Sequence, residues 1–98
     1  MKLEVNVIEI KGYCPVHDVG DKFELIEGYR LQHPNGKPIC MHALASLMPF
    51  YNALAKGVKP EKMGLAGKES GKLYFQCMDP VHLTDGGTAV FQVKQVLD

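Results

Sequence analysis

Alternating apolar and polar residues near both ends of the chain, with one helical pattern between them, most restrict the possible fold. In residues 2–10, apolar side chains at positions 3, 5 and 7 share one face, as in a strand with one buried side. Ile8 and Ile10 then fall on the opposite face, so we expect a β-bulge near Val7 and Ile8. The segment therefore predicts a long strand with an irregularity in its second half.

The rest of the chain supplies partners for that strand. Three more segments alternate and are expected to be strands: 23–26, 73–77 and 89–94. Residues 38–56 instead repeat apolar side chains at spacings of three and four, which is typical of a helix that covers an apolar surface. Pro49 has no N–H to donate to the Ala45 carbonyl, so the helix should kink or split there.

These patterns predict an α+β fold. We expect a small, mostly antiparallel sheet of about four strands, packed against one helix that is kinked by a proline. The 98 residues fit a single domain, which we take to span residues 1–98.

Charge and hydropathy exclude several classes of protein. Eleven basic and eleven acidic side chains cancel, and Arg30 is the sole arginine, which argues against nucleic acid as a partner. No apolar run approaches the roughly 18 residues of a membrane span, and the first residues lack the apolar stretch of a signal peptide. We therefore expect a cytoplasmic protein that does not bind membranes. In that reducing compartment its three cysteines would be free thiols or metal ligands.

The segment GYCPVHDVGD at residues 12–21 separates the first two expected strands and is long for a hairpin connection. Cys14 and His17 stand at a spacing that allows both to bind one metal ion. Cys40 near the start of the helix and Cys77 at the end of a strand would complete a set of three cysteines and one histidine. We expect zinc or iron there, and an iron–sulfur cluster less so because its usual four cysteines are absent.

A thiol-dependent enzyme is an alternative interpretation. Cys40 lies in the first turn of the expected helix, whose leading N–H groups lack a side-chain cap, and the lysine-rich residues 56–72 would attract a small anionic metabolite. Catalytic residues remain unassigned. An aspartate could orient His17, and the candidates in the chain are Asp18, Asp21 and Asp79. We nevertheless interpret the first two as turn residues, and His33 in the segment HPNGKP as an exposed turn residue.

The third interpretation is an accessory or oligomer-forming interaction protein with buried structural cysteines. Residues 1–27 carry three lysines and six acids, whereas residues 28–72 carry seven basic residues and two acids. Segments of opposite charge suit association with another copy of the chain or with a partner protein. The chain would then be a homo-oligomer or one subunit of a complex.

Three short motifs resemble those of a family of small microbial proteins of uncharacterised function, mostly from anaerobes. Members are similar to this chain in CP-x-x-H-x-x-GD around Cys14 and His17, in AL-x-x-L-x-P after Cys40, and in C-x-DP at Cys77. The resemblance covers nearly the whole chain, although members often carry a histidine where this chain has Ala45. It implies a shared site at the three cysteines and His17, and it implies no particular reaction.

Overall fold

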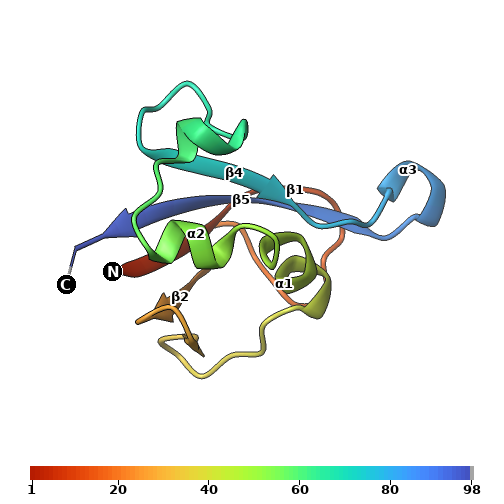
Figure 1. Ribbon diagram of the computed structural model, residues 1–98. Coiled ribbons are helices and arrows are strands. Elements are labelled where there is room, and N and C mark those ends of the chain that lie inside the picture. The colour runs from red at the N-terminus through yellow and green to blue at the C-terminus, as the bar shows by residue number, and fades with distance from the viewer. Residues whose placement is uncertain (98) are drawn as a thin grey trace.

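The computed structural model describes residues 1–97 and has an α+β fold, as predicted (Figure 1). Five antiparallel strands form one sheet in the order β3-β2-β1-β5-β4, one strand more than the sequence predicted. The two longest strands lie at its centre, namely β1 (Lys2–Gly12) and β5 (Gly87–Val96). In this arrangement the beginning and the end of the described chain lie side by side.

The predicted bulge in the first strand is confirmed. The pairing of β1 with β5 shifts register between Val7 and Glu9. Before the shift, Val5 lies opposite Val93, and after it Ile10 lies opposite Ala89. An extra residue reverses which side chains face the core, so Ile10 returns to the apolar face while Ile8 stays exposed.

The remaining strands complete the sheet on both sides of this central pair. On one side β2 (Lys22–Ile26) pairs with β1, and β3 (Arg30–Gln32) follows it at the edge. On the other side β4 (Lys72–Gln76) pairs with β5. The sequence did not predict β3, because three exposed residues show no alternation of buried and exposed positions.

The expected helix divides at its proline, as predicted. It forms α1 (Met41–Leu47) and α2 (Tyr51–Ala55), with Pro49 in the turn between them. The first helix begins at Met41 rather than at Pro38, so Cys40 is the residue that precedes the helix. Two short elements that the sequence did not predict follow, the 3-10 helix η1 (Pro60–Met63) and α3 (Val81–Thr84).

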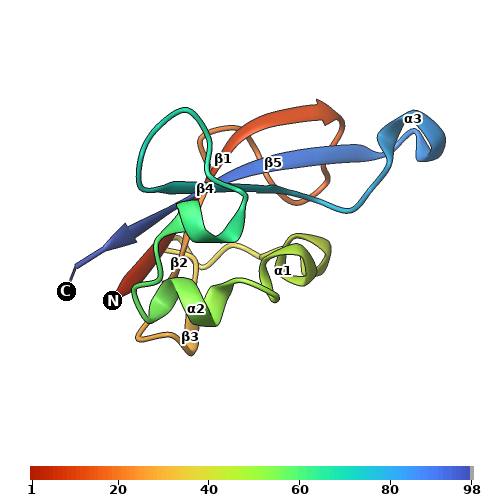
Figure 2. The ribbon, with the colours of Figure 1, turned by 45° about the horizontal axis from the view of Figure 1, so that its top comes forward.

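The core lies between one face of the sheet and the helices α1 and α2 (Figure 2). Its largest fully buried apolar side chains come from four strands and one helix: Leu3, Phe23, Leu54, Leu73 and Phe91. The opposite face of the sheet carries charged side chains, among them Lys2 and Glu24 in an ion pair of 2.9 Å. Within residues 1–97, none of the helices has the length and apolarity to cross a membrane.

Candidate functional site

The long connection between β1 and β2 folds back onto the strands it joins. The backbone N–H of Gly20 donates to the Val7 carbonyl at 2.8 Å, and the backbone N–H of Val7 donates to the Asp21 carbonyl at 2.9 Å. Gly20 has a φ of 93°, a conformation that glycine adopts without the strain other residues would incur. These contacts turn residues 14–21 inward, so that His17 is only 1% exposed.

The ring of His17 belongs to the apolar core on two sides. It stacks on Phe23 with ring centroids 5.8 Å apart and meets Phe91 edge-on at the same separation. Rings packed in this way are held in one orientation. The connection therefore places the His17 imidazole in the core in a fixed orientation.

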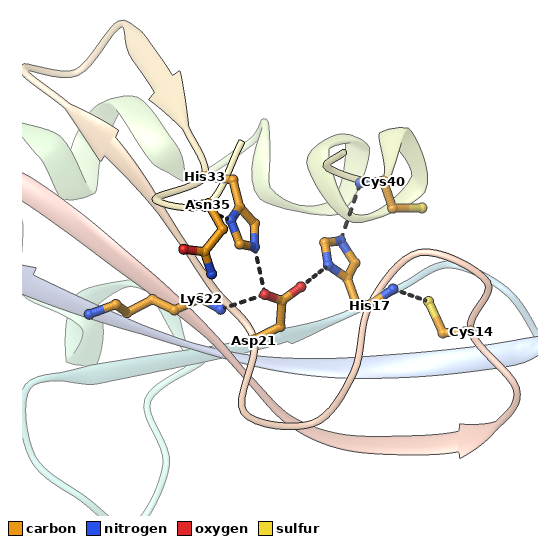
Figure 3. Close-up of polar contacts among 7 residues, drawn as sticks. All are labelled: Cys14, His17, Asp21, Lys22, His33, Asn35 and Cys40. Atoms are coloured by element: carbon orange, nitrogen blue, oxygen red, sulfur yellow. Dashed lines mark hydrogen bonds and ion pairs between the residues drawn. The ribbon is translucent and has the colours of Figure 1, made fainter. Parts of the chain in front are cut away.

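Asp21 joins two buried histidines (Figure 3). One carboxylate oxygen lies 2.9 Å from Nδ1 of His17, and the other lies 2.5 Å from Nε2 of His33. The backbone N–H of Lys22 donates to the second oxygen at 3.1 Å. We call His17, Asp21 and His33 the His–Asp–His network.

Backbone donors determine which ring nitrogens carry protons in this network. The Asn35 N–H donates to Nδ1 of His33 at 3.1 Å, and the Cys40 N–H donates to Nε2 of His17 at 3.2 Å. A nitrogen that accepts a hydrogen bond has a free lone pair, so in each neutral ring the other nitrogen is protonated. Both rings thus donate to Asp21, and the lone pair of His17 Nε2 is directed towards Cys40.

The hydrogen bonds keep Asp21 ionised. Burial raises the pKa of its carboxyl, but the hydrogen bonds from His17 and then His33 outweigh burial and hold that pKa below its ordinary value. Among residues 1–97, every buried side-chain nitrogen or oxygen has a hydrogen-bond partner. The buried charge of Asp21 is therefore stabilised by hydrogen bonds to both of its oxygens.

Two of the three cysteines are in contact with His17. The Sγ of Cys14 accepts a hydrogen bond from the backbone N–H of His17 at 3.3 Å, and Cys40 donates its own N–H to the ring. Both cysteines are half-buried. Figure 3 shows both thiol groups on the side of His17 away from Asp21, with that of Cys40 pointing away from the ring.

Cys77 lies farther along the sheet. It follows β4, is buried, and donates its backbone N–H to the Ala89 carbonyl at 2.8 Å. Ala89 also pairs with Ile10 of β1, so Cys77 is two strand spacings, roughly 10 Å, from the end of β1. Two of the predicted ligands, Cys14 and Cys40, therefore each contact the third, His17, whereas Cys77 is held by its backbone bond to β5.

The ligand atoms are close in the fold but not in coordinating positions. In the part of the chain that is described, no group of three or more Cys, His, Asp or Glu side chains is already arranged to hold a metal ion. The thiols of Cys14 and Cys40 would have to rotate to share an ion with His17. The metal site thus remains a prediction about the loaded protein.

Sequence reasoning assigned no role to two members of the network. The interpretation of His33 as an exposed turn residue is wrong, since His33 is buried. Asp21 does lie in a turn, where its N–H donates to the Asp18 carbonyl at 3.0 Å, but its side chain is also buried and bonds both histidines. The other two candidates for orienting His17 do not do so. Asp18 is exposed in the loop, and Asp79 bonds Thr84 and the Gly87 N–H beside α3.

Comparison with known proteins adds no relative. No protein-family model, curated protein or solved structure matches this chain.

Proposed function

We propose that the protein binds one zinc or ferrous ion through Cys14, His17 and Cys40. The observation that carries this proposal is the orientation of His17, whose Nδ1–H is donated to Asp21 while its Nε2 lone pair is directed towards Cys40. Metal-binding histidines usually donate their second ring nitrogen to a carboxylate in this way, which fixes the tautomer and makes the ligating nitrogen more basic.

The remaining parts of the network support the same role. His33 and the Lys22 N–H bind the second oxygen of Asp21, so the carboxylate that orients His17 is itself held in place. The Cys14 sulfur already accepts the His17 N–H, a type of contact that stabilises a sulfur ligand. The chain thus supplies an oriented nitrogen and, next to it, two soft donors suited to zinc or ferrous iron.

Binding requires small local changes. The ion would take the Nε2 position that the Cys40 N–H occupies at 3.2 Å, a long and therefore weak hydrogen bond. The Cys40 side chain makes no capping hydrogen bond at the helix start, so turning its thiol towards the ring breaks no such bond. Both thiols lose their protons when they bind the ion, and this makes the affinity rise with pH.

The predicted fourth ligand determines the class of site. Three protein ligands leave a position open for water or a substrate, as in catalytic zinc sites, whereas a fourth cysteine would close the site. Cys77 occurs in the third motif that resembles the microbial family, although it follows β4 and its backbone N–H bonds Ala89 of β5 rather than His17. We propose the three-ligand site and use Cys77 as the residue that distinguishes the two classes.

The test is metal content and affinity of protein purified without oxygen. Wild type should carry about one zinc or iron per chain, and Cys14→Ser or Cys40→Ser should weaken the affinity at least ~100-fold. Cys77→Ser is the matched control and should change the affinity less than about threefold if the site has three protein ligands. Less than about a tenth of an ion per chain, with no binding of added Zn²⁺, would contradict the proposal.

A further inference from the structure

The two outer edges of the sheet differ in whether another segment covers them. Along β4, the Tyr74 N–H donates to the Leu65 carbonyl at 3.0 Å, and Ala66 forms an isolated bridge with Leu73. Along β3 all residues are exposed, and within residues 1–97 no strand pairs with its outer side. An open edge presents backbone N–H and carbonyl groups to which another strand can bind.

An apolar groove runs beside this open edge. It has a volume of about 250 Å³ and is lined by apolar and aromatic side chains of β2, β3, α1 and α2 and of the residues just before β3 and just after α1: Leu25, Tyr29, Leu31, Leu44, Leu47, Met48 and Tyr51. That volume is below the roughly 300–1,000 Å³ of small-molecule sites, so the groove suits a few protein side chains rather than a cofactor. It contains no charged side chain.

We propose that β3 and this groove bind a second copy of the chain. The two β3 strands pair antiparallel about a two-fold axis at Leu31, and the sheets join into one of ten strands. Leu31 then lies opposite the second copy's Leu31 on the groove side, and Tyr29 of each copy reaches across the axis. This interface rests on observations separate from those that support the metal site.

Charge permits this register. Pairing about Leu31 sets Arg30 opposite the neutral Gln32 of the other copy, so no like charges face each other. Arg30 is also neutralised within its own chain by Glu27, at 2.5 Å. The chain as a whole has no net charge at neutral pH, so two copies do not repel each other at long range.

Symmetry favours a second copy over an unrelated extended peptide. A peptide added to β3 would leave its own outer edge open, whereas two β3 strands cover each other and remove both open edges. The copy also brings a complementary apolar surface, because Tyr29, Met48 and Leu31 are 72%, 58% and 37% exposed.

The size of this surface predicts a weak dimer. A buried aromatic side chain covers roughly 150–250 Å², so Tyr29, Met48 and Leu31 with the strand backbone supply a few hundred Å² per copy. The total is close to the ~1,000 Å² at which specific interfaces begin. Association should therefore depend on concentration in the micromolar range.

Sedimentation equilibrium and NMR of the full chain test the dimer. Between about 5 and 500 µM the average mass should rise from one chain towards two, and the amide signals of residues 29–32 should shift over the same range. Leu31→Glu should weaken the dimer at least ~tenfold because it buries two carboxylates at the axis. Leu83→Glu is the matched control, since Leu83 is 77% exposed on α3, and should change the dissociation constant less than twofold, or about 0.4 kcal/mol.

Three results would overturn the proposal. One is a single-chain mass at every concentration, which would leave the edge of β3 open for a foreign peptide instead. Another is a dimer that Leu83→Glu weakens and Leu31→Glu does not. If Leu31→Glu is misfolded by circular dichroism, Tyr29→Ser replaces it, and an unchanged dissociation constant for that variant would be the third.

Discussion

Two of the long connections in the chain, residues 13–21 and residues 64–71, differ in whether their polar side chains are buried or exposed. Residues 13–21 bury His17 and Asp21 and satisfy both with hydrogen bonds to other segments. Residues 64–71, between η1 and β4, are largely exposed, and their charges pair locally, as Glu69 does with Lys72. Buried and fully bonded polar groups indicate a selected arrangement, whereas exposed charges near a connection are typical of a solvated surface.

This comparison bears on the alternative of a thiol enzyme that attracts an anion. The lysine-rich residues 56–72 do not form a preorganised anion-binding site. Glu61 accepts the Gly71 N–H there, so a carboxylate lies where an anion would have to bind. The backbone N–H of Gly71 and the charge of Lys59 hold the pKa of Glu61 below its ordinary value, so this carboxylate is ionised. Substitutions in residues 13–21 should therefore change stability and zinc affinity much more than substitutions in residues 64–71.

His17→Ala should have the largest effect on stability. It removes a ring packed between Phe23 and Phe91 and leaves the Cys40 N–H and one oxygen of Asp21 without their partner. Cavity formation and lost hydrogen bonds together should reduce the free energy of unfolding by about 3–5 kcal/mol. Urea denaturation measures this, with the exposed His82→Ala as control at less than about 0.5 kcal/mol. A cost below about 1 kcal/mol for His17→Ala would show that the network does not stabilise the fold.

Asp21→Asn should have the next largest effect. An amide offers one acceptor oxygen where two histidines donate, so one ring nitrogen loses its partner. We expect a loss of about 2 kcal/mol in the free energy of unfolding and a ~10–100-fold loss of zinc affinity. Asp18→Asn in the same connection is the matched control, because Asp18 is exposed. Equal affinities of wild type and Asp21→Asn would argue that Asp21 does not orient a metal ligand.

The stability of the metal-free protein should depend on Asp21 in acid. Because the pKa of Asp21 is lower in the folded chain, its contribution is present above the unfolded value of about 3.9 and is lost as pH falls through the folded value. Unfolding free energies from pH 7 down to pH 2 should therefore decline more steeply for wild type than for Asp21→Asn. Parallel profiles would mean that Asp21 is not the group responsible.

Substitutions in the second connection should have the smallest effects. Lys68→Ala removes an exposed charge with no buried partner to expose, so the melting temperature should change by less than about 2 °C. Zinc affinity should stay within about twofold of wild type, since the site is formed by residues 14–40. A large loss of affinity would restore the interpretation that this loop attracts the ligand, and thermal denaturation with metal titration decides it.

Local patterns in the sequence predicted much of the fold. The change of apolar phase at Val7 and Ile8 predicted the bulge, and Pro49 predicted the break between α1 and α2, because each follows from backbone chemistry within a few residues. The strand β3 was not predicted, since pairing with β2 defines it and its own side chains are all exposed.

The candidate site could be predicted only in part for a related reason. The spacing of Cys14 and His17 indicated two neighbouring donors, and Cys40 follows from the helix start. His33 and Asp21 are 12 residues apart and meet only because the β2–β3 hairpin returns the chain to the first connection. A contact that depends on tertiary folding leaves no periodic signal in the sequence, which is why the contact between these two side chains was not predicted.

X-ray absorption of the zinc-loaded protein tests the central claim, that Cys14, His17 and Cys40 form a metal site oriented by Asp21, most directly. The spectrum should show two sulfur ligands at about 2.3 Å and one imidazole nitrogen at about 2.0 Å, with the imidazole signal lost in a folded His17→Gln variant and one sulfur lost in Cys40→Ser. A first shell of oxygen and nitrogen alone, or one that neither substitution changes, would contradict it.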